Sequence, residues 1–110
     1  MKETKLQKAF EGLNSHYFDG KVPISTKVVF GEPTRNADAH YDKKRNEIVI
    51  NKVIRDHDTL VLICLLHEMI HAKLESTYVG SASSDDPFHG MIYQAEIVRL
   101  FNAGAYDGLL

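Results

Sequence analysis

The chain has 110 residues, which is the size of one domain, and 44% hydrophobic with 25% charged residues is an ordinary globular composition. A formal net charge of -2 argues against a nucleic-acid binder that is held mainly by bulk charge. The single cysteine, Cys64, excludes an intramolecular disulfide and a zinc ribbon or finger, which needs at least two thiolates.

No segment has the character of a membrane span. The longest unbroken apolar run covers residues 60–66 and is far too short to cross a bilayer. The first residues lack the apolar core of a signal peptide. The sequence therefore predicts an intracellular, cytoplasmic protein without a membrane segment.

The first predicted element is a helix over residues 2–18. Its apolar side chains recur every three or four positions, which is the spacing of one helix face: Leu6, Phe10, Leu13, Tyr17. Gly20 and Pro23 then break the pattern and end the helix.

Three short segments follow, of which residues 27–30 and 47–51 are rich in β-branched residues. Residues 27–30, 37–41 and 47–51 are predicted strands, and the last is the strongest. A loop over residues 31–36 and a charged turn over residues 42–46 separate them. We expect a small, mostly antiparallel sheet of three strands.

The strongest prediction is a helix over residues 58–74, with Asp58 as its N-cap. Apolar residues occupy nearly every side of this helix, which is typical of a helix buried in the core. We expect it to lie centrally, between the sheet and the other helices.

Residues 75–86 are polar and are predicted to form a loop, and residues 87–102 form the last predicted helix. Asp86 is its candidate N-cap, Pro87 its first residue, and Gly104 its stop signal. The order helix, strands, helix, helix predicts an α+β domain over residues 1–110.

The clearest functional signal is the pattern His-Glu-x-x-His, formed by His67, Glu68 and His71 inside the central helix. Residues four apart in a helix leave the same face, with Cβ atoms about 6 Å apart, so both imidazoles can bind one zinc ion. Glu68 would then lie beside the ion, where a carboxylate can take a proton from a zinc-bound water. The spacing therefore predicts a zinc site with Glu68 as the general base.

A catalytic zinc site needs a third protein ligand and keeps a fourth position for water. His89 stands in the first turn of the last predicted helix, and the following Gly90 lets that helix approach a metal closely. The other candidates are carboxylates: Glu75, Asp85, Asp86, Glu96. We expect His89 to be the ligand. Glu96 would then contact a ligand rather than the metal, or would simply lie on the surface.

The same pattern has an interpretation that needs no metal, in which His67 and His71 are hydrogen-bonded core histidines. Two imidazoles and a carboxylate in one apolar helix are costly to bury without a common partner. The cost favours the zinc site.

These residues resemble the SprT-like (Spartan-type) zinc metallopeptidase domain. The resemblance rests on the His-Glu-x-x-His helix followed, after a variable loop, by His89-Gly90-x-x-Tyr93. Residues 13–21 resemble the family's first helix and its exit, and residues 47–51 resemble the strand before the active helix. The likeness covers about residues 6–102.

The resemblance implies a zinc-dependent endopeptidase in which His67, His71 and His89 bind Zn²⁺ and Glu68 is the general base. Family members degrade proteins crosslinked to DNA and are switched on by DNA. The implied partners are therefore a protein or peptide substrate and, more weakly, single-stranded DNA, with a role in DNA–protein crosslink repair.

Several other residues allow more than one interpretation. His40 and Tyr41 could line the cleft, either as transition-state donors or as a strand edge that pairs with an extended substrate, although half-exposed strand residues are the simpler interpretation. The basic residues 43–45 could touch phosphate or could simply be solvated. Cys64 and Tyr93 are expected to pack. His16 and His57 receive no role.

Two other functions fit the same residues. The first is a zinc-bound domain that binds DNA or a protein partner without significant proteolysis. The second is hydrolysis of a non-peptide bond, because zinc-assisted attack by water is not confined to amides.

Overall fold

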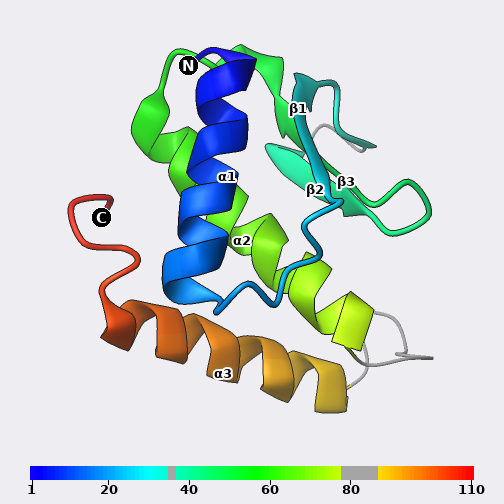
Figure 1. Ribbon diagram of the computed structural model, residues 1–110, viewed down its shortest axis with the longest axis vertical. Coiled ribbons are helices and arrows are strands. Elements are labelled where there is room, and N and C mark those ends of the chain that lie inside the picture. The colour runs from blue at the N-terminus through cyan, green and yellow to red at the C-terminus, as the bar shows by residue number, and fades with distance from the viewer. Residues whose placement is uncertain (35–36, 78–86) are drawn as a thin grey trace.

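The helix α2, Asp58–Thr77, runs through the middle of the protein and contacts both other helices and two strands (Figure 1). The computed structural model describes residues 1–34, 37–77 and 87–110, with the side chains of residues 77 and 87–89 excepted. Many α2 side chains are fully buried: Val61, Leu65, Leu66, Met69, Ile70, Ala72. The prediction of a central helix with apolar residues on most sides is confirmed.

The helix α1, Glu3–Tyr17, is the predicted first helix, one residue shorter at each end. It buries Leu6 and Phe10 completely, as their spacing indicated. The helix ends where Asp19 and Gly20 adopt positive φ angles of 51° and 71°. The N–H of Gly20 donates to the carbonyl of Asn14 at 2.9 Å, which closes the last turn.

The buried side chain of Asn14 fixes the segment that leaves α1. Its amide nitrogen donates to the carbonyl of Val22 at 2.9 Å, and the N–H of Val22 donates back to its Oδ1 at 3.0 Å. One asparagine thus satisfies both backbone groups of a fully buried residue. This pairing directs the chain from α1 into the sheet.

The sheet contains β1, Lys27–Gly31, β2, Ala39–Asp42, and β3, Glu47–Asn51, in the order β1-β3-β2. β2 and β3 are antiparallel, but β1 and β3 are parallel, so the sheet is mixed. The prediction of a mostly antiparallel sheet was therefore wrong.

The sheet order follows from burial and from chain connections. β3 carries three consecutive buried residues, Ile48, Val49 and Ile50, and such a strand belongs in the centre of a sheet. A short turn over residues 43–46 joins β2 to β3 and makes that pair antiparallel. The chain reaches β3 from β1 only by passing through β2, and this crossover leaves β1 parallel to β3.

The start of α2 differs slightly from the prediction. A short 3₁₀ turn, η2, Lys52–Ile54, joins β3 to the helix region, and Asp58 is the first helical residue rather than the cap. Lys5 donates to the Asp58 carboxylate at 3.2 Å, which ties α1 to this helix start. Residues 75–77 extend α2 beyond its predicted end. Residues 78–86, with Asp85 and the predicted cap Asp86, lie outside the described residues.

The last helix, α3, Pro87–Ala103, crosses the ends of α1 and α2 in Figure 1. It is one residue longer than predicted, and Gly104 follows it with a φ of 90°. Three helices and a three-stranded mixed sheet make this an α+β protein, as expected. In the described part of the chain, every helix is too short or too polar to cross a membrane.

Replacing Asn14 tests its role in the fold. Asn14→Ala leaves the buried N–H and C=O of Val22 without these partners, so we expect a loss of about 2–4 kcal/mol in the free energy of unfolding. Urea denaturation measures the loss. Ser15→Ala, on the exposed neighbour, is the control and should change stability little; equal effects of the two substitutions would contradict the argument.

Candidate active site

His67 and His71 project from the same face of α2, and their ring centroids lie 5.3 Å apart. His67 is exposed and His71 is half-buried, so the interpretation of both as core histidines does not hold for His67. Desolvation by the surrounding residues lowers the pKa of His67. This favours the neutral imidazole, which is the form that binds a metal.

Glu68 is buried, with only 6% of its surface exposed. Burial, and then the negative charge of Glu75, raise the pKa of Glu68 to about 7, although a hydrogen bond from the backbone N–H of Tyr41 opposes the rise. A buried carboxylate whose pKa lies near neutrality can both accept and return a proton.

A cavity of about 270 Å³ lies against this face of α2. It is lined from α2 and from the start of β2: Asp38, Ala39, Ile63, Cys64, His67, Glu68. Cys64 also packs against the core, as expected. The cavity therefore brings one histidine and the carboxylate of the His-Glu-x-x-His pattern to a common space at the edge of the sheet.

The free edge of β2 faces this space. The N–H of Tyr41 donates to Glu68 and so points away from β3, the only strand that pairs with β2 among the described residues. Backbone groups alternate in direction along a strand, so those of Ala39 leave by the same edge. The phenol of Tyr41 is used elsewhere, because it donates to Asn46 at 3.1 Å.

Tyr93 of α3 lies against both histidines. Its hydroxyl is 2.7 Å from Nδ1 and 2.9 Å from Nε2 of His67, and its ring centroid is 4.7 Å from that of His71. Burial, and then the charge of Glu68, raise the pKa of Tyr93. The residue packs against the core as expected, but its hydroxyl also reaches the candidate ligands.

Two carboxylates proposed as alternative ligands have other contacts. Glu75 lies one turn after His71, with its Oε2 3.9 Å from Nδ1 of that ring. Glu96 of α3 binds Lys73 of α2 at 2.7 Å and Arg99 at 2.9 Å. Burial raises the pKa of Glu96, but the hydrogen bonds from Arg99 and Lys73 outweigh burial and hold its pKa below the usual value.

The contacts of Glu96 make it a link between helices. Arg99, which binds it, also donates to the carbonyl of Tyr17 at the end of α1, at 2.7 Å. Lys73, Glu96 and Arg99 thus connect all three helices. A carboxylate held by two cations is poorly suited to bind a metal, which counts against Glu96 as the third ligand.

His89 is the third residue of α3, as the sequence predicted, but its side chain lies outside the described residues. Within the described residues, no three His, Cys, Asp or Glu side chains form a group that could hold a metal. His67 and His71 supply two imidazoles on one helix face, and this donor set suits zinc.

The other residues singled out in the sequence lie away from this face. Residues 43–45 are exposed in the turn between β2 and β3. Nδ1 of His40 accepts a hydrogen bond from the N–H of Thr34 at 3.4 Å, and the ring of His16 packs edge-on against Tyr17. These contacts give neither histidine a place in the site.

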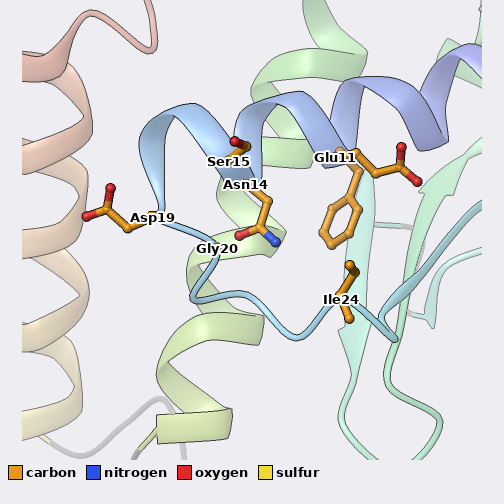
Figure 2. Close-up of a pocket in the computed structure, with 7 residues that line it drawn as sticks. Glu11, Asn14, Ser15, Asp19, Gly20 and Ile24 are labelled. Atoms are coloured by element: carbon orange, nitrogen blue, oxygen red, sulfur yellow. The ribbon is translucent and has the colours of Figure 1, made fainter.

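A larger cavity, of about 450 Å³, lies between α1 and the segment that leads to β1 (Figure 2). Asn14 lies among its lining residues, but both ends of its amide are bonded to the backbone of Val22. The lining shares no residue with the cavity at Glu68. This space carries no cluster of groups suited to catalysis.

The protein is an α+β domain in which the helix with the His-Glu-x-x-His pattern packs against the edge strand β2. The family model for the SprT-like family matches residues 6–105, nearly the whole chain, and the protein belongs to this family. The family is associated with metallopeptidase-like domains and generally with zinc. Comparisons with curated proteins and with solved structures gave no match.

The sequence did not predict two contacts of the candidate site, although it drew attention to both Tyr41 and Tyr93. The N–H of Tyr41 is a backbone group, and no residue pattern marks it. The hydroxyl of Tyr93 could have been found, because Tyr93 lies four residues after His89 and therefore on the same face of α3.

The pH dependence of stability tests the Glu96 link. The pKa of Glu96 is lower in the folded protein, so its contribution is present above its unfolded pKa and is lost as the pH falls through the folded value. At pH 7, Glu96→Gln should cost about 1–2 kcal/mol in the free energy of unfolding. The difference from wild type should shrink below about pH 4.5, near the unfolded pKa of a glutamate.

Chemical denaturation from pH 3 to pH 8 measures this difference. Glu11→Gln, at an exposed glutamate of α1, is the control and should have little effect throughout. A cost of Glu96→Gln that is equal at pH 3 and pH 7 would show that charge plays no part.

Proposed function

We propose that this protein is a zinc-dependent endopeptidase of the SprT-like type. One observation carries the proposal: the buried carboxylate of Glu68, fixed by the Tyr41 N–H, shares a cavity with His67 at the open edge of β2. A general base, an imidazole ligand and a strand edge for an extended chain are the parts that zinc-assisted peptide hydrolysis needs.

His67, His71 and His89 would hold the zinc ion. The first two satisfy the geometry within one helix, and His89 stands in the first turn of the helix that packs beside them. When bound, zinc supplies a Lewis acid that polarises the scissile carbonyl.

The substrate would bind as an extended peptide along the free edge of β2. Ala39 directs its backbone groups to that edge and also lines the cavity beside Glu68. Main-chain hydrogen bonds to a strand edge are insensitive to side-chain identity. This mode of binding suits an enzyme that acts on unfolded or damaged proteins of varied sequence.

Glu68 would move the proton. It accepts a proton from the water whose oxygen attacks the carbonyl carbon, and it returns that proton to the amine nitrogen as the C–N bond breaks. The Tyr41 N–H keeps the carboxylate oriented toward the cavity throughout.

Substrates associated with or crosslinked to DNA form the finer part of the proposal. The exposed basic residues 43–45 lie in the turn that joins β2 to β3, and β2 is the strand whose unpaired edge faces the cavity. Single-stranded DNA bound weakly at this turn would bring a DNA-bound protein close to the cavity. The same observation favours the alternative function, a zinc-bound module that binds DNA or a protein without significant proteolysis.

The decisive experiment replaces the general base. Glu68→Gln should keep bound zinc and the fold but reduce cleavage of a denatured protein by about 10²–10⁴-fold, because proton transfer is lost. Cleavage is followed with and without single-stranded DNA, alongside metal analysis and circular dichroism.

Glu32→Gln, at an exposed glutamate, is the matched control and should cleave like the wild type. Equal turnover by wild type and Glu68→Gln would reject the mechanism. Zinc and DNA binding without turnover in the wild type would favour the binding module.

The third ligand has its own test. His89→Ala should lower the zinc content of the purified protein, because it removes one of three ligands. Glu96→Gln should retain zinc, since Lys73 and Arg99 occupy that carboxylate. Full zinc occupancy in His89→Ala, with loss in Glu96→Gln, would transfer the role to Glu96.

A further inference from the structure

The hydroxyl of Tyr93 is a polar group of the site that the proposed mechanism does not use. It lies 2.7 Å from Nδ1 and 2.9 Å from Nε2 of His67, so it can donate a hydrogen bond to whichever ring nitrogen lacks a proton. Its ring also lies tilted against the imidazole of His71. Tyr93 thus contacts both histidines from a different helix.

The position of this hydroxyl is fixed by packing. Tyr93 is half-buried and packs against the core through its ring. Glu96, three residues further along α3, binds Lys73 of α2 at 2.7 Å and so holds this part of α3 against α2. These contacts hold the Tyr93 ring beside the two histidines.

A hydroxyl 2.9 Å from Nε2 of a candidate ligand is a neighbour of whatever that nitrogen binds. A phenol carries one O–H group and can donate a hydrogen bond while it remains neutral. The site therefore contains a hydrogen-bond donor beside His67, next to the place that the scissile carbonyl takes in the proposed mechanism. Donors fixed in this way stabilise negative charge that develops on a carbonyl oxygen.

We propose that Tyr93 is a catalytic hydrogen-bond donor, which leaves His67 when that histidine binds metal and then donates to the scissile carbonyl oxygen in the transition state. This inference rests on the proposed peptidase function. As the water oxygen bonds to the carbonyl carbon, Glu68 takes the water proton and the carbonyl π electrons move to oxygen. Tyr93 keeps its proton and donates a hydrogen bond to that oxygen. When the C–N bond breaks, the carbonyl re-forms and Glu68 protonates the amine.

Loss of the phenol oxygen should raise the free energy of the transition state, and it should free His67 for metal. Tyr93→Phe should therefore lower kcat about 10²-fold with KM within twofold of wild type, because one preorganised donor is lost. Its Kd for Zn²⁺, measured by competition with a chelating dye, should equal that of wild type or be lower.

Binding of a phosphinic peptide, whose tetrahedral centre resembles the transition state, gives a readout that needs no turnover. Tyr93→Phe should bind this peptide at least ~10-fold more weakly than the wild type does. A cleavable peptide of the same sequence, bound to the Glu68→Gln protein with and without Tyr93→Phe, should show little difference.

Tyr17→Phe is the matched control, since the Tyr17 hydroxyl contacts the carbonyl of Gly104 at 3.5 Å, away from the histidines. It should match the wild type in kcat and in zinc affinity. Thermal unfolding of both variants checks that the fold is retained.

The outcomes separate the two proposals. Hydrolysis by Tyr93→Phe at the wild-type rate overturns the donor role and leaves the peptidase function standing. A higher Kd for Zn²⁺, with activity lost in proportion, also overturns it, because Tyr93 would then support the metal instead. Absence of hydrolysis in the wild type, with equal phosphinic-peptide binding by both proteins, overturns both proposals.

Discussion

The burial of Glu68 is the constraint around which this protein is arranged. A carboxylate in the middle of the most apolar helix is costly to bury unless its oxygens find donors. The N–H of Tyr41 meets this need, and it is available because β2 stands at the edge of the sheet. The contact that satisfies the carboxylate therefore also links α2 to the open strand.

The mixed sheet follows the same logic. Had β2 paired on both sides, Tyr41 would have used its N–H within the sheet, and no free edge would face Glu68. The order β1-β3-β2 instead puts the apolar β3 in the centre and leaves β2 beside α2. The cavity at Glu68 is thus a product of strand order as much as of the residues that line it.

Much of this architecture is predictable from residue patterns, and the exceptions are informative. The helices and β3 follow from local periodicity and stop signals, which act within a few residues of one another. The parallel pairing of β1 with β3 depends on a contact across some 20 positions, as Val28 lies opposite Ile48, and periodicity carries no such information.

In the candidate site, too, relations within one element were predictable and contacts between elements were not. His67, Glu68 and His71 were predictable because a single helix sets their relation, and their spacing encodes it. The donor from Tyr41, the position of the Tyr93 hydroxyl and the engagement of Glu96 all arise between elements. They depend on how α2 meets β2 and α3, which the sequence alone did not determine.

The ion pair of Lys73 with Glu96 has a consequence for how the site responds to its ligands. It joins the helix that carries the two histidines to the helix that carries Tyr93 and His89. A ligand held by both helices favours their packed arrangement, and by thermodynamic reciprocity the packed arrangement favours the ligand by the same free energy. The affinity for such a ligand and the stability of the α2–α3 packing are therefore coupled. A substitution at Lys73 or Glu96, away from the histidines, can change both.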